Sequence, residues 1–551
     1  MIKYTGLSLL MILLLPFSSK AQLMAKKEMN SRADSLRGML TPLRTCYDVK
    51  YYHLDVTIDI EQKAIRGSNE FVFTAVQDFS KLQFDLFANL SVDKIIYKGQ
   101  ELKFSREFNA VFVNFPKVIK KGSKDTFTVF YSGKPIVGKN PPWDGGFIFK
   151  KDKAGKPWVS VACQGMGASV WWPNKDHQSD EVDSMLISIT VPQDLQEISN
   201  GRLRSTIAKD NGRKQFNWFV SNPINNYDVT FYIGDYAHWT DQYTGEKGKL
   251  SIDYWSLKQD SAVARPHWDA DVKPMLSCFE KWFGPYPFYE DGYKLVQAPH
   301  LGMEHQSAVA YGNQFKKGYL GRDLSGTGLG LKFDFIIVHE SGHEWFGNNI
   351  TSKDIADMWI HEGFTNYSEV LFTECTVSKE AGSLYARGIR RVIKNDGPVI
   401  GPYNVNKEGS GDMYPKGANM IHLIRQLIND DSKFRDILRG LNQKFYHKTV
   451  TTKEVEDYIA AKSGLKLNKV FDQYLRQTNI PTLEYKINGQ ELSYRWISDV
   501  KGFDMPVKVT TAKDRFTLIY PSENWKRMKV SVDATNFKQD ADFYINIKKA
   551  D

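Results

Sequence analysis

Two histidines four residues apart, His339 and His343, enclose a glutamate in the pattern His-Glu-x-x-His. Residues four apart on a helix project from one face, so these two imidazoles can share one tetrahedral Zn²⁺. Glu340 would then lie beside the metal, where a carboxylate can accept a proton from a water molecule. The apolar stretches 335–338 and 345–346 can bury such a helix. The spacing therefore predicts a buried helix that carries a metal site with hydrolytic chemistry.

A catalytic zinc site needs a third protein ligand and keeps its fourth position for water. Glu362 follows His343 after 18 residues, which leaves room for the first helix to end near 347–349 and for a second helix to return antiparallel. The metzincin pattern needs glycine and histidine at the third and sixth places after the second histidine, and phenylalanine and asparagine stand there instead. The expected ligands of one Zn²⁺ per chain are therefore His339, His343 and Glu362.

Strands are expected before this helix. Residues 52–60 alternate between apolar and polar side chains, as a half-buried strand does, and strand-like runs follow at 71–73, 127–131 and 185–191. An N-terminal β domain over 46–238 follows from this pattern.

Helices are expected around and after the histidine pair, because apolar residues recur there at spacings of three to four. The predicted helices are 271–283, 332–347, 357–373, 416–429, 433–446, 453–461 and 467–477. Past Pro481 the alternation returns on both sides of the turn pair Asn488-Gly489, which indicates a β-hairpin. The pattern predicts a helix-rich domain over 239–480 and a small β domain over 481–551, in an α+β multidomain chain.

The composition suits this class. The chain has 551 residues, of which 42% are hydrophobic and 25% are charged, enough apolar material for several packed cores. The net charge of +9 is spread along the sequence, so no nucleic-acid partner is expected. The four cysteines lie more than 90 residues apart, which excludes a Cys-x-x-Cys clip and leaves one disulfide or none equally open.

The N-terminus has the pattern of a secretory signal peptide over 1–21, with Lys3 before an apolar run and Ser19 and Ala21 at the cleavage site. The run is about 11 residues long, whereas a helix needs about 20 to span a bilayer, so no membrane span is expected in the mature chain. Residues 22–45 are polar and predict a tether or a surface helix. An exported protein, periplasmic or secreted, is expected.

The segment 339–343, the 18-residue gap, the segment 359–369 and the phrase 343–348 together resemble the M1 family of zinc aminopeptidases. The resemblance covers nearly all of the mature chain. It implies an N-terminal β saddle, a thermolysin-like catalytic domain and a small C-terminal β sandwich.

Two further motifs enter through this resemblance. Residues 301–305 resemble the family's Gly-x-Met-Glu-Asn motif, which implies that Glu304 binds the free amino group of a peptide and that Gly302 and Met303 lie along its backbone. Residues 414–417 resemble Tyr-x-Lys-Gly, which implies that Tyr414 stabilises the oxyanion of the tetrahedral intermediate.

The sequence departs from these motifs around the expected amine site. Leu301 stands in the place of glycine and His305 in the place of asparagine. Residues 163–168 resemble the family's Gln-Gly-Glu segment, with Met166 in the place of a second acid or amide. Amine recognition is therefore expected to rest on Glu304 with help from Gln164.

Other candidate residues are expected to be structural. Asn366 and Glu369 follow Glu362 by one and two helical turns, and polar residues on a helix surface are the preferred interpretation over supports for the ligands. His177 and His300 are interpreted as structural, and the glycine-rich stretch 318–330 as a flexible loop.

The expected function is hydrolysis of N-terminal amino acids from peptides by a zinc-activated water. Two alternatives stay open. An endopeptidase or an atypical exopeptidase would fit the altered amine motif, and an exported peptide- or glycan-binding protein would fit a vestigial zinc site. The oligomeric state is not indicated by the sequence.

Overall fold

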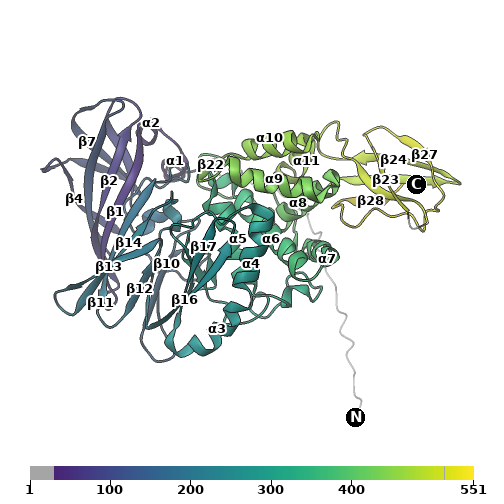
Figure 1. The fold of residues 1–551 in the computed structure, drawn as a ribbon. Coiled ribbons are helices and arrows are strands. Elements are labelled where there is room, and N and C mark those ends of the chain that lie inside the picture. Colours follow the sequence, from purple (N-terminus) through teal and green to yellow (C-terminus); the bar gives the residue numbers. More distant parts are fainter. Residues whose placement is uncertain (1–29, 514, 551) are drawn as a thin grey trace, which may run out of the picture.

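The computed structural model describes residues 30–513 and 515–550. The predicted signal peptide, 1–21, and the first part of the predicted tether, 22–29, lie outside the described residues. Figure 1 shows three regions in a row: an N-terminal β domain, a helix-rich domain and a C-terminal β domain at the far end. This order matches the fold class expected from the sequence.

Three sheets build the N-terminal β domain. Eight strands follow the order β13-β14-β11-β1-β2-β8-β4-β5, four the order β12-β15-β10-β9, and three the order β3-β7-β6. Their bounds are β1 (Tyr47–Asp59), β2 (Ala64–Ala75), β3 (Phe79–Asp85), β4 (Leu90–Tyr97), β5 (Gln100–Glu101), β6 (Phe104–Glu107), β7 (Ala110–Ile119), β8 (Lys124–Gly133), β9 (Gly146–Lys151), β10 (Pro157–Ala162), β11 (Ser184–Pro192), β12 (Gln196–Ser199), β13 (Arg202–Lys209), β14 (Arg213–Val220) and β15 (Phe231–Gly234). The alternation predicted over 52–60 is confirmed over 52–59, the last part of β1, where apolar side chains are buried while their neighbours stay half-exposed.

The segment predicted as a tether or surface helix is helical and packed. It forms α1 (Arg32–Gly38) and α2 (Pro42–Thr45). Leu36 is buried, and the buried Arg44 pairs with Asp85 of β3. From Arg32 onward this segment is part of the folded molecule rather than a loose tether.

A five-stranded sheet, β16-β17-β18-β20-β19, lies on one side of the helix-rich domain, with β19 at its edge. The strands are β16 (Tyr236–Gly245), β17 (Gly248–Leu257), β18 (Tyr293–Gln297), β19 (Gly302–Met303) and β20 (Val309–Tyr311), with the separate pair β21 (Ile350–Ser352) and β22 (Lys448–Val450). The helices are α3 (Ser261–Asp269), α4 (Val272–Phe283), α5 (Phe335–Gly342), α6 (Trp359–Thr376), α7 (Lys379–Ile389), α8 (Pro415–Ile428), α9 (Asp431–Lys444), α10 (Thr452–Ser463) and α11 (Asn468–Phe471).

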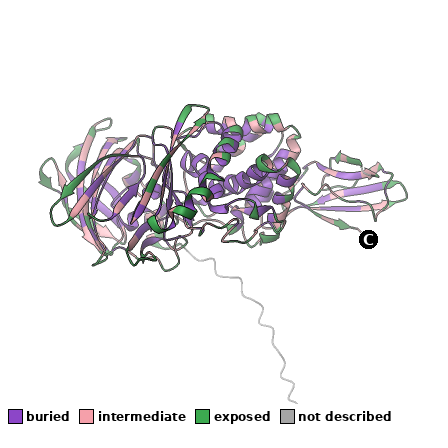
Figure 2. Ribbon diagram, turned by 60° about the horizontal axis from the view of Figure 1, so that its bottom comes forward, coloured by how far each residue is buried: buried purple, intermediate pink, exposed green. Residues whose placement is uncertain are grey.

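All seven predicted helices are present, but α3 and α7 were not predicted. α3 carries Pro266 in its interior, and α7 contains Gly382 and Gly388. Because proline and glycine disfavour helices, neither helix was recognisable in the sequence. Two predicted helices are shorter than expected. In 332–347, α5 ends at Gly342 and a π turn follows over Glu344–Asn348, and in 467–477, α11 ends at Phe471 and a π turn follows over Asp472–Arg476. Buried residues concentrate in the helices of this domain (Figure 2).

One disulfide, Cys278–Cys375, joins α4 to the end of α6. The other two cysteines, Cys46 and Cys163, are free and buried. The sequence left one disulfide or none equally open, and the structure has one. This disulfide anchors the end of α6, the helix that carries Glu362.

The C-terminal β domain contains the predicted hairpin, formed by β23 (Thr482–Asn488) and β24 (Glu491–Ile497). Asn488 pairs with Glu491, so the turn lies on Gly489-Gln490, one residue later than predicted. Gly489 takes the positive φ, 58°, that this turn requires. The hairpin belongs to the sheet β27-β24-β23-β28, beside the pair β25-β26; their bounds are β25 (Val507–Ala512), β26 (Arg515–Ile519), β27 (Lys526–Lys529) and β28 (Asn546–Lys549).

Among residues 30–513 and 515–550, no helix has the length and apolar character needed to cross a membrane.

Candidate active site

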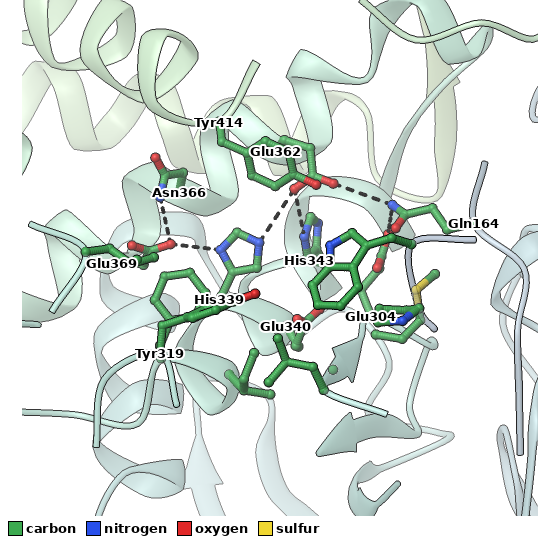
Figure 3. A pocket seen from close by; sticks show the side chains of 18 of the residues that line it. Gln164, Glu304, Tyr319, His339, Glu340, His343, Glu362, Asn366, Glu369 and Tyr414 are labelled. Carbon is green, nitrogen blue, oxygen red and sulfur yellow. Dashed lines mark hydrogen bonds and ion pairs between the residues drawn. The ribbon is translucent and has the colours of Figure 1, made fainter. Parts of the chain in front are cut away.

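A pocket of about 520 Å³ lies between the N-terminal β domain and the helix-rich domain. The first domain contributes Gln164 and Gly165, and the second contributes β19, α5, α6 and the start of α8. Figure 3 shows the histidine pair in the middle of this pocket, with Gln164 and Glu304 on one side and Glu369 and Asn366 on the other.

Helix α5 presents the histidine pair from within the core. Its N-cap Asp334 accepts hydrogen bonds from the backbone of Ile336 and Ile337, which fixes where the helix begins. At its end, a Cβ on Gly342 would lie 2.6 Å from the hydroxyl of Ser368 on α6. Glycine at this position therefore lets α6 approach closely enough to bring Glu362 to the histidines.

His339, His343 and Glu362 converge, and their ligand atoms lie within 4.8 Å of one another. Glu362 Oε2 is 3.6 Å from His339 Nε2 and 3.3 Å from His343 Nε2. The structure thus brings the three predicted ligands together, and these three residues are called the triad below.

The donor set of the triad fits a zinc ion. Both Nδ1 atoms face acceptors, because His339 Nδ1 lies 2.8 Å from Glu369 Oε1 and His343 Nδ1 lies 3.0 Å from the carbonyl of Phe346. In the neutral imidazoles the protons are then on Nδ1, and both Nε2 lone pairs point toward Glu362. Since Glu362 Oε2 is buried without a hydrogen-bond donor, three lone-pair donors face one space, which is the arrangement that a tetrahedral cation requires.

Glu369 supports this arrangement, and the expectation of a surface role for it was wrong. Its buried carboxylate accepts hydrogen bonds from His339, from Asn366 Nδ2 at 2.8 Å and from Tyr385 at 2.6 Å. The carboxylate fixes the ring orientation and tautomer of His339, and Asn366 in turn orients the carboxylate. The seven-residue spacing from Glu362, two helical turns on one face, was the signal in the sequence.

The π turn after α5 orients the second histidine. Gly347 takes a φ of 136°, which bends the chain so that the carbonyl of Phe346 returns to His343 Nδ1. Thr365 of α6 contacts the same nitrogen at 3.2 Å. The π turn that ends α5 therefore fixes the orientation of the His343 ring.

Glu340 points into the pocket beside Glu304. Both carboxylates place an oxygen within 4.8 Å of His343 and of each other. Burial, opposed by His339 but reinforced by Glu304, raises the pKa of Glu340 to about 7. Burial also raises the pKa of Glu304. A carboxylate with a pKa near neutrality can both accept and return a proton, as a general base must.

Tyr414 lies at the entrance to α8, directly before Pro415 at the first helical position. Its ring stacks against that of His339 with a centroid distance of 6.0 Å, and its side chain lines the same pocket as Glu362. Burial and the negative charge of Glu362 raise the pKa of Tyr414 well above its usual value, so the phenol stays protonated and can donate.

The amine side is formed by Glu304 and Gln164. Gln164 Nε2 donates to Glu304 Oε1 at 2.6 Å and contacts Glu362 Oε1 at 3.5 Å, and so connects the predicted amine anchor to the triad. Gly302 and Met303 line the same wall as the edge strand β19. These four residues lie together as the sequence predicted.

Met166, which stands in the place of the family's second acid or amide, does not line this pocket. Its sulfur packs against Gly145 instead. Gln164, two residues earlier, occupies the position beside Glu304.

His305, which stands in the place of the motif's asparagine, does not line the pocket either. His305 is fully buried, and its Nδ1 hydrogen-bonds Tyr232 of β15 at 2.7 Å. Leu301 does line the pocket. His177 and His300 lie outside the pocket wall, in line with their structural interpretation.

Several pocket residues were not found from the sequence, among them Glu408 and Trp143. Glu408 lies in the segment 401–410 before Tyr414, and Trp143 lies in the segment that leads into β9. Neither belongs to a recognisable motif, and only the folded chain brings them to Gln164 and Gly165.

Two sequence models of one peptidase family match this chain. The peptidase M1 N-terminal domain matches residues 48–227, and the peptidase family M1 domain matches residues 271–474. The chain belongs to peptidase family M1, as the motif resemblance indicated.

Curated relatives are distant. Tricorn protease-interacting factor F2 of Thermoplasma volcanium is 20% identical over 71% of this chain, which spans 51% of that protein, or about half of its length. Leukotriene A-4 hydrolase of Xenopus laevis is 22% identical over 75% of this chain and 68% of its own length. Probable aminopeptidase 2 of Sulfurisphaera tokodaii is 20% identical over 83% of this chain and 63% of its own length.

Solved structures share the fold. The M1 zinc metallopeptidase from Deinococcus radiodurans superposes with a TM-score of 0.66 at 20% identity, over 79% of this chain and 94% of that one. A mutant two-domain M1 zinc metallopeptidase bound to L-tryptophan superposes with a TM-score of 0.67, over 80% of this chain and 96% of that one.

Proposed function

We propose that this protein is a zinc aminopeptidase that removes the first residue from peptides. The observation that carries the proposal is the position of Glu304, whose carboxylate approaches Glu340 and His343 within 4.8 Å. The α-nitrogen and carbonyl carbon of one amino acid are only about 2.5 Å apart. An ammonium group held by Glu304 therefore places the carbonyl of that same residue at the triad.

The same geometry argues against an endopeptidase. A substrate cut internally would have to continue past Glu304 toward its N-terminus. Gln164 hydrogen-bonds Glu304 at 2.6 Å and contacts Glu362 at 3.5 Å, and we infer that it closes the pocket on that side. The complete set of triad, base and tyrosine likewise favours an enzyme over a binding protein with a vestigial site.

Each side chain has a distinct role in the proposal. His339, His343 and Glu362 would hold a zinc ion, which would supply Lewis-acid chemistry to polarise the scissile carbonyl and to make a water molecule easier to deprotonate. Glu340 takes the proton of the attacking water and returns it to the leaving amine. Tyr414 donates its phenolic proton as a hydrogen bond to the oxyanion, a contact typically worth about 3 to 4 kcal/mol.

The test compares aminoacyl amides with free and N-acetylated amino groups. We expect the free amides to be cleaved and the acetylated ones to resist, since acetylation removes the charge that pairs with Glu304. Glu304→Gln should abolish most of this preference. Equal cleavage of free and acetylated substrates by the wild type would refute the aminopeptidase proposal.

The metal content and the export are proposed as well. One zinc per chain follows from a single triad, and metal analysis of the purified protein checks it.

The proposal that the protein is exported rests on the sequence pattern over 1–21. N-terminal sequencing of the protein from the exported fraction should find a chain that begins at Gln22, and an intact Met1 in that fraction would contradict this expectation.

A further inference from the structure

One carboxylate in the pocket, that of Glu408, has no part in the chemistry described above. Four other glutamates line the pocket, and each has a partner or a proposed role: Glu304, Glu340, Glu362 and Glu369. The described pocket wall contains no lysine or arginine. After a zinc ion and a substrate α-ammonium are placed, Glu408 is the acidic group that still lacks a cation.

Glu408 lies over the segment that carries Gln164. Its Oε1 is 3.6 Å from the position that a Cβ on Gly165 would take. Among the described residues the carboxylate forms neither a hydrogen bond nor an ion pair. Burial, followed by the charges of Glu362 and Glu304, raises the pKa of Glu408 to about 7. A second positive charge is what this carboxylate needs in order to be stabilised as an anion.

The loop that carries Glu408 is fixed by its surroundings. The carbonyl of Gly165 accepts one hydrogen bond from Asn406 Nδ2 at 3.0 Å and another from Arg37 Nη2 at 2.8 Å. Gly38 at the end of α1 packs so tightly on Val405 and Asn406 that a Cβ there would lie 2.2 Å from the Asn406 nitrogen. The backbone that carries Glu408 is therefore fixed before a substrate arrives, which lowers the entropic cost of an interaction with this residue.

An aromatic wall lies at the same end of the pocket. Gly146 pairs with Ala162 in the sheet, and Gly145 contacts Ala162 and Met166, so the segment with Trp143 runs beside the segment with Gly165. The Trp143 side chain lines the pocket and is otherwise exposed. An aromatic face together with a carboxylate suits a long side chain that has an alkyl stem and a cationic end.

We propose that Glu408 makes this enzyme select peptides whose first residue is lysine or arginine. The proposal rests on the aminopeptidase function proposed above. Glu304 holds the α-ammonium at the end of the pocket where Glu408 and Trp143 lie. The side chain of the substrate's first residue therefore extends from this end. A lysine ammonium or an arginine guanidinium that reaches Glu408 forms a charge-assisted hydrogen bond.

The test uses a pair of substrates that differ only in charge. Lysine amide and norleucine amide have side chains of similar length, and the ratio of their kcat/KM values measures the recognition of the ammonium group. We expect a wild-type ratio well above one and a fall of about tenfold or more in Glu408→Gln, which corresponds to the 1.5 kcal/mol or more of a hydrogen bond between charged groups. Glu380→Gln, an exposed carboxylate on α7, is the matched control and should leave the ratio unchanged.

The possible results separate the two proposals. If free aminoacyl amides are cleaved but the ratio does not change in Glu408→Gln, the selectivity proposal is wrong and the aminopeptidase proposal stands. An equal loss for both substrates would also overturn it, because Glu408 would then contact the α-ammonium. If free and N-acetylated norleucine amide are cleaved equally, the aminopeptidase proposal itself fails. Glu408→Lys should favour glutamate amide over lysine amide, and a retained preference for lysine would count against a direct contact.

Discussion

The two sides of the pocket differ in the elements that build them. The triad side comes from α5 and α6, two buried helices that Cys278–Cys375 and close packing at Gly342 hold within one core. The amine side comes from an edge strand and two irregular segments, which carry Glu304, Gln164 and Glu408.

The contacts that fix the two sides also differ in range. Glu369 supports His339 across 30 residues of sequence, whereas Arg37 and Asn406 reach Gly165 across 128 and 241 residues. Helical geometry therefore positions the side chains that bind the metal and catalyse the reaction. Contacts between domains position the side chains that recognise the substrate. We infer that substitutions on the triad side abolish turnover or metal binding, and that substitutions on the amine side change which substrate is taken.

The largest effect is expected for Glu340→Gln on the triad side. This change removes the proton acceptor at nearly constant volume and leaves the three ligands in place. We expect kcat to fall by about 10² to 10⁴ while zinc content stays at the wild-type level, as measured by steady-state kinetics and metal analysis. A variant that kept more than about a tenth of wild-type kcat would show that Glu340 is not the base.

A smaller effect is expected for Glu369→Ala, which removes the partner of His339 Nδ1. Loss of a carboxylate behind a metal-bound histidine typically weakens metal affinity by about 10- to 100-fold. Zinc affinity measured by competition with a chelator should show this loss, and Tyr385→Phe, which removes one hydrogen bond to the same carboxylate, should show less. Unchanged affinity in Glu369→Ala would mean that His339 is held by other contacts.

The difference between the two sides explains what the sequence could predict. Helical spacing of three, four and seven residues places side chains on one face, so His339, His343 and, after a connection, Glu362 could be assembled from the sequence. Glu369 lies at the same periodicity. A polar residue on a helix has the same sequence pattern whether it faces solvent or a metal ligand. Only its burial beside Tyr385 and Asn366 shows that Glu369 faces the ligand.

The amine side has no periodicity of this kind. In the segment 163–166 the residue that faces Glu304 depends on the backbone of the turn, and the positive φ of Gly165, 74°, directs Gln164 rather than Met166 into the pocket region. Glu408 meets Gly165 only through the packing of two domains, and Trp143 comes near Gly165 only through the pairing of β9 with β10. The fold class and the strands could be predicted from alternation, but this convergence could not.

The pH dependence of selectivity sharpens the contrast. Since the pKa of Glu408 is raised to about 7, mainly by burial, its carboxylate becomes neutral as the pH falls through that value. The preference for lysine amide over norleucine amide should therefore be larger at pH 8 than at pH 6, by up to about tenfold. Groups that act on both substrates, such as Glu340 and the α-amine, cancel in the ratio. In Glu408→Gln the ratio should not vary with pH, and a parallel slope in that variant would assign the titration to another group.

The smallest effect is expected from Arg37, the α1 residue that positions the amine side without touching it. Arg37→Ala removes one of the two hydrogen bonds to the Gly165 carbonyl and leaves the one from Asn406, so Gln164 and Glu408 should become less well held. A net hydrogen bond is worth about 0.5 to 1.5 kcal/mol, which predicts a rise in KM of roughly two- to tenfold. The kcat should change less, because α5 and α6 are untouched. Arg32→Ala, on the same helix as Arg37, breaks an exposed ion pair with Glu107 of β6; it is the control and should change neither constant. If Arg37→Ala lowered kcat as strongly as it raised KM, the N-terminal helix would act on both sides of the pocket, and the separation of chemistry from recognition would be lost.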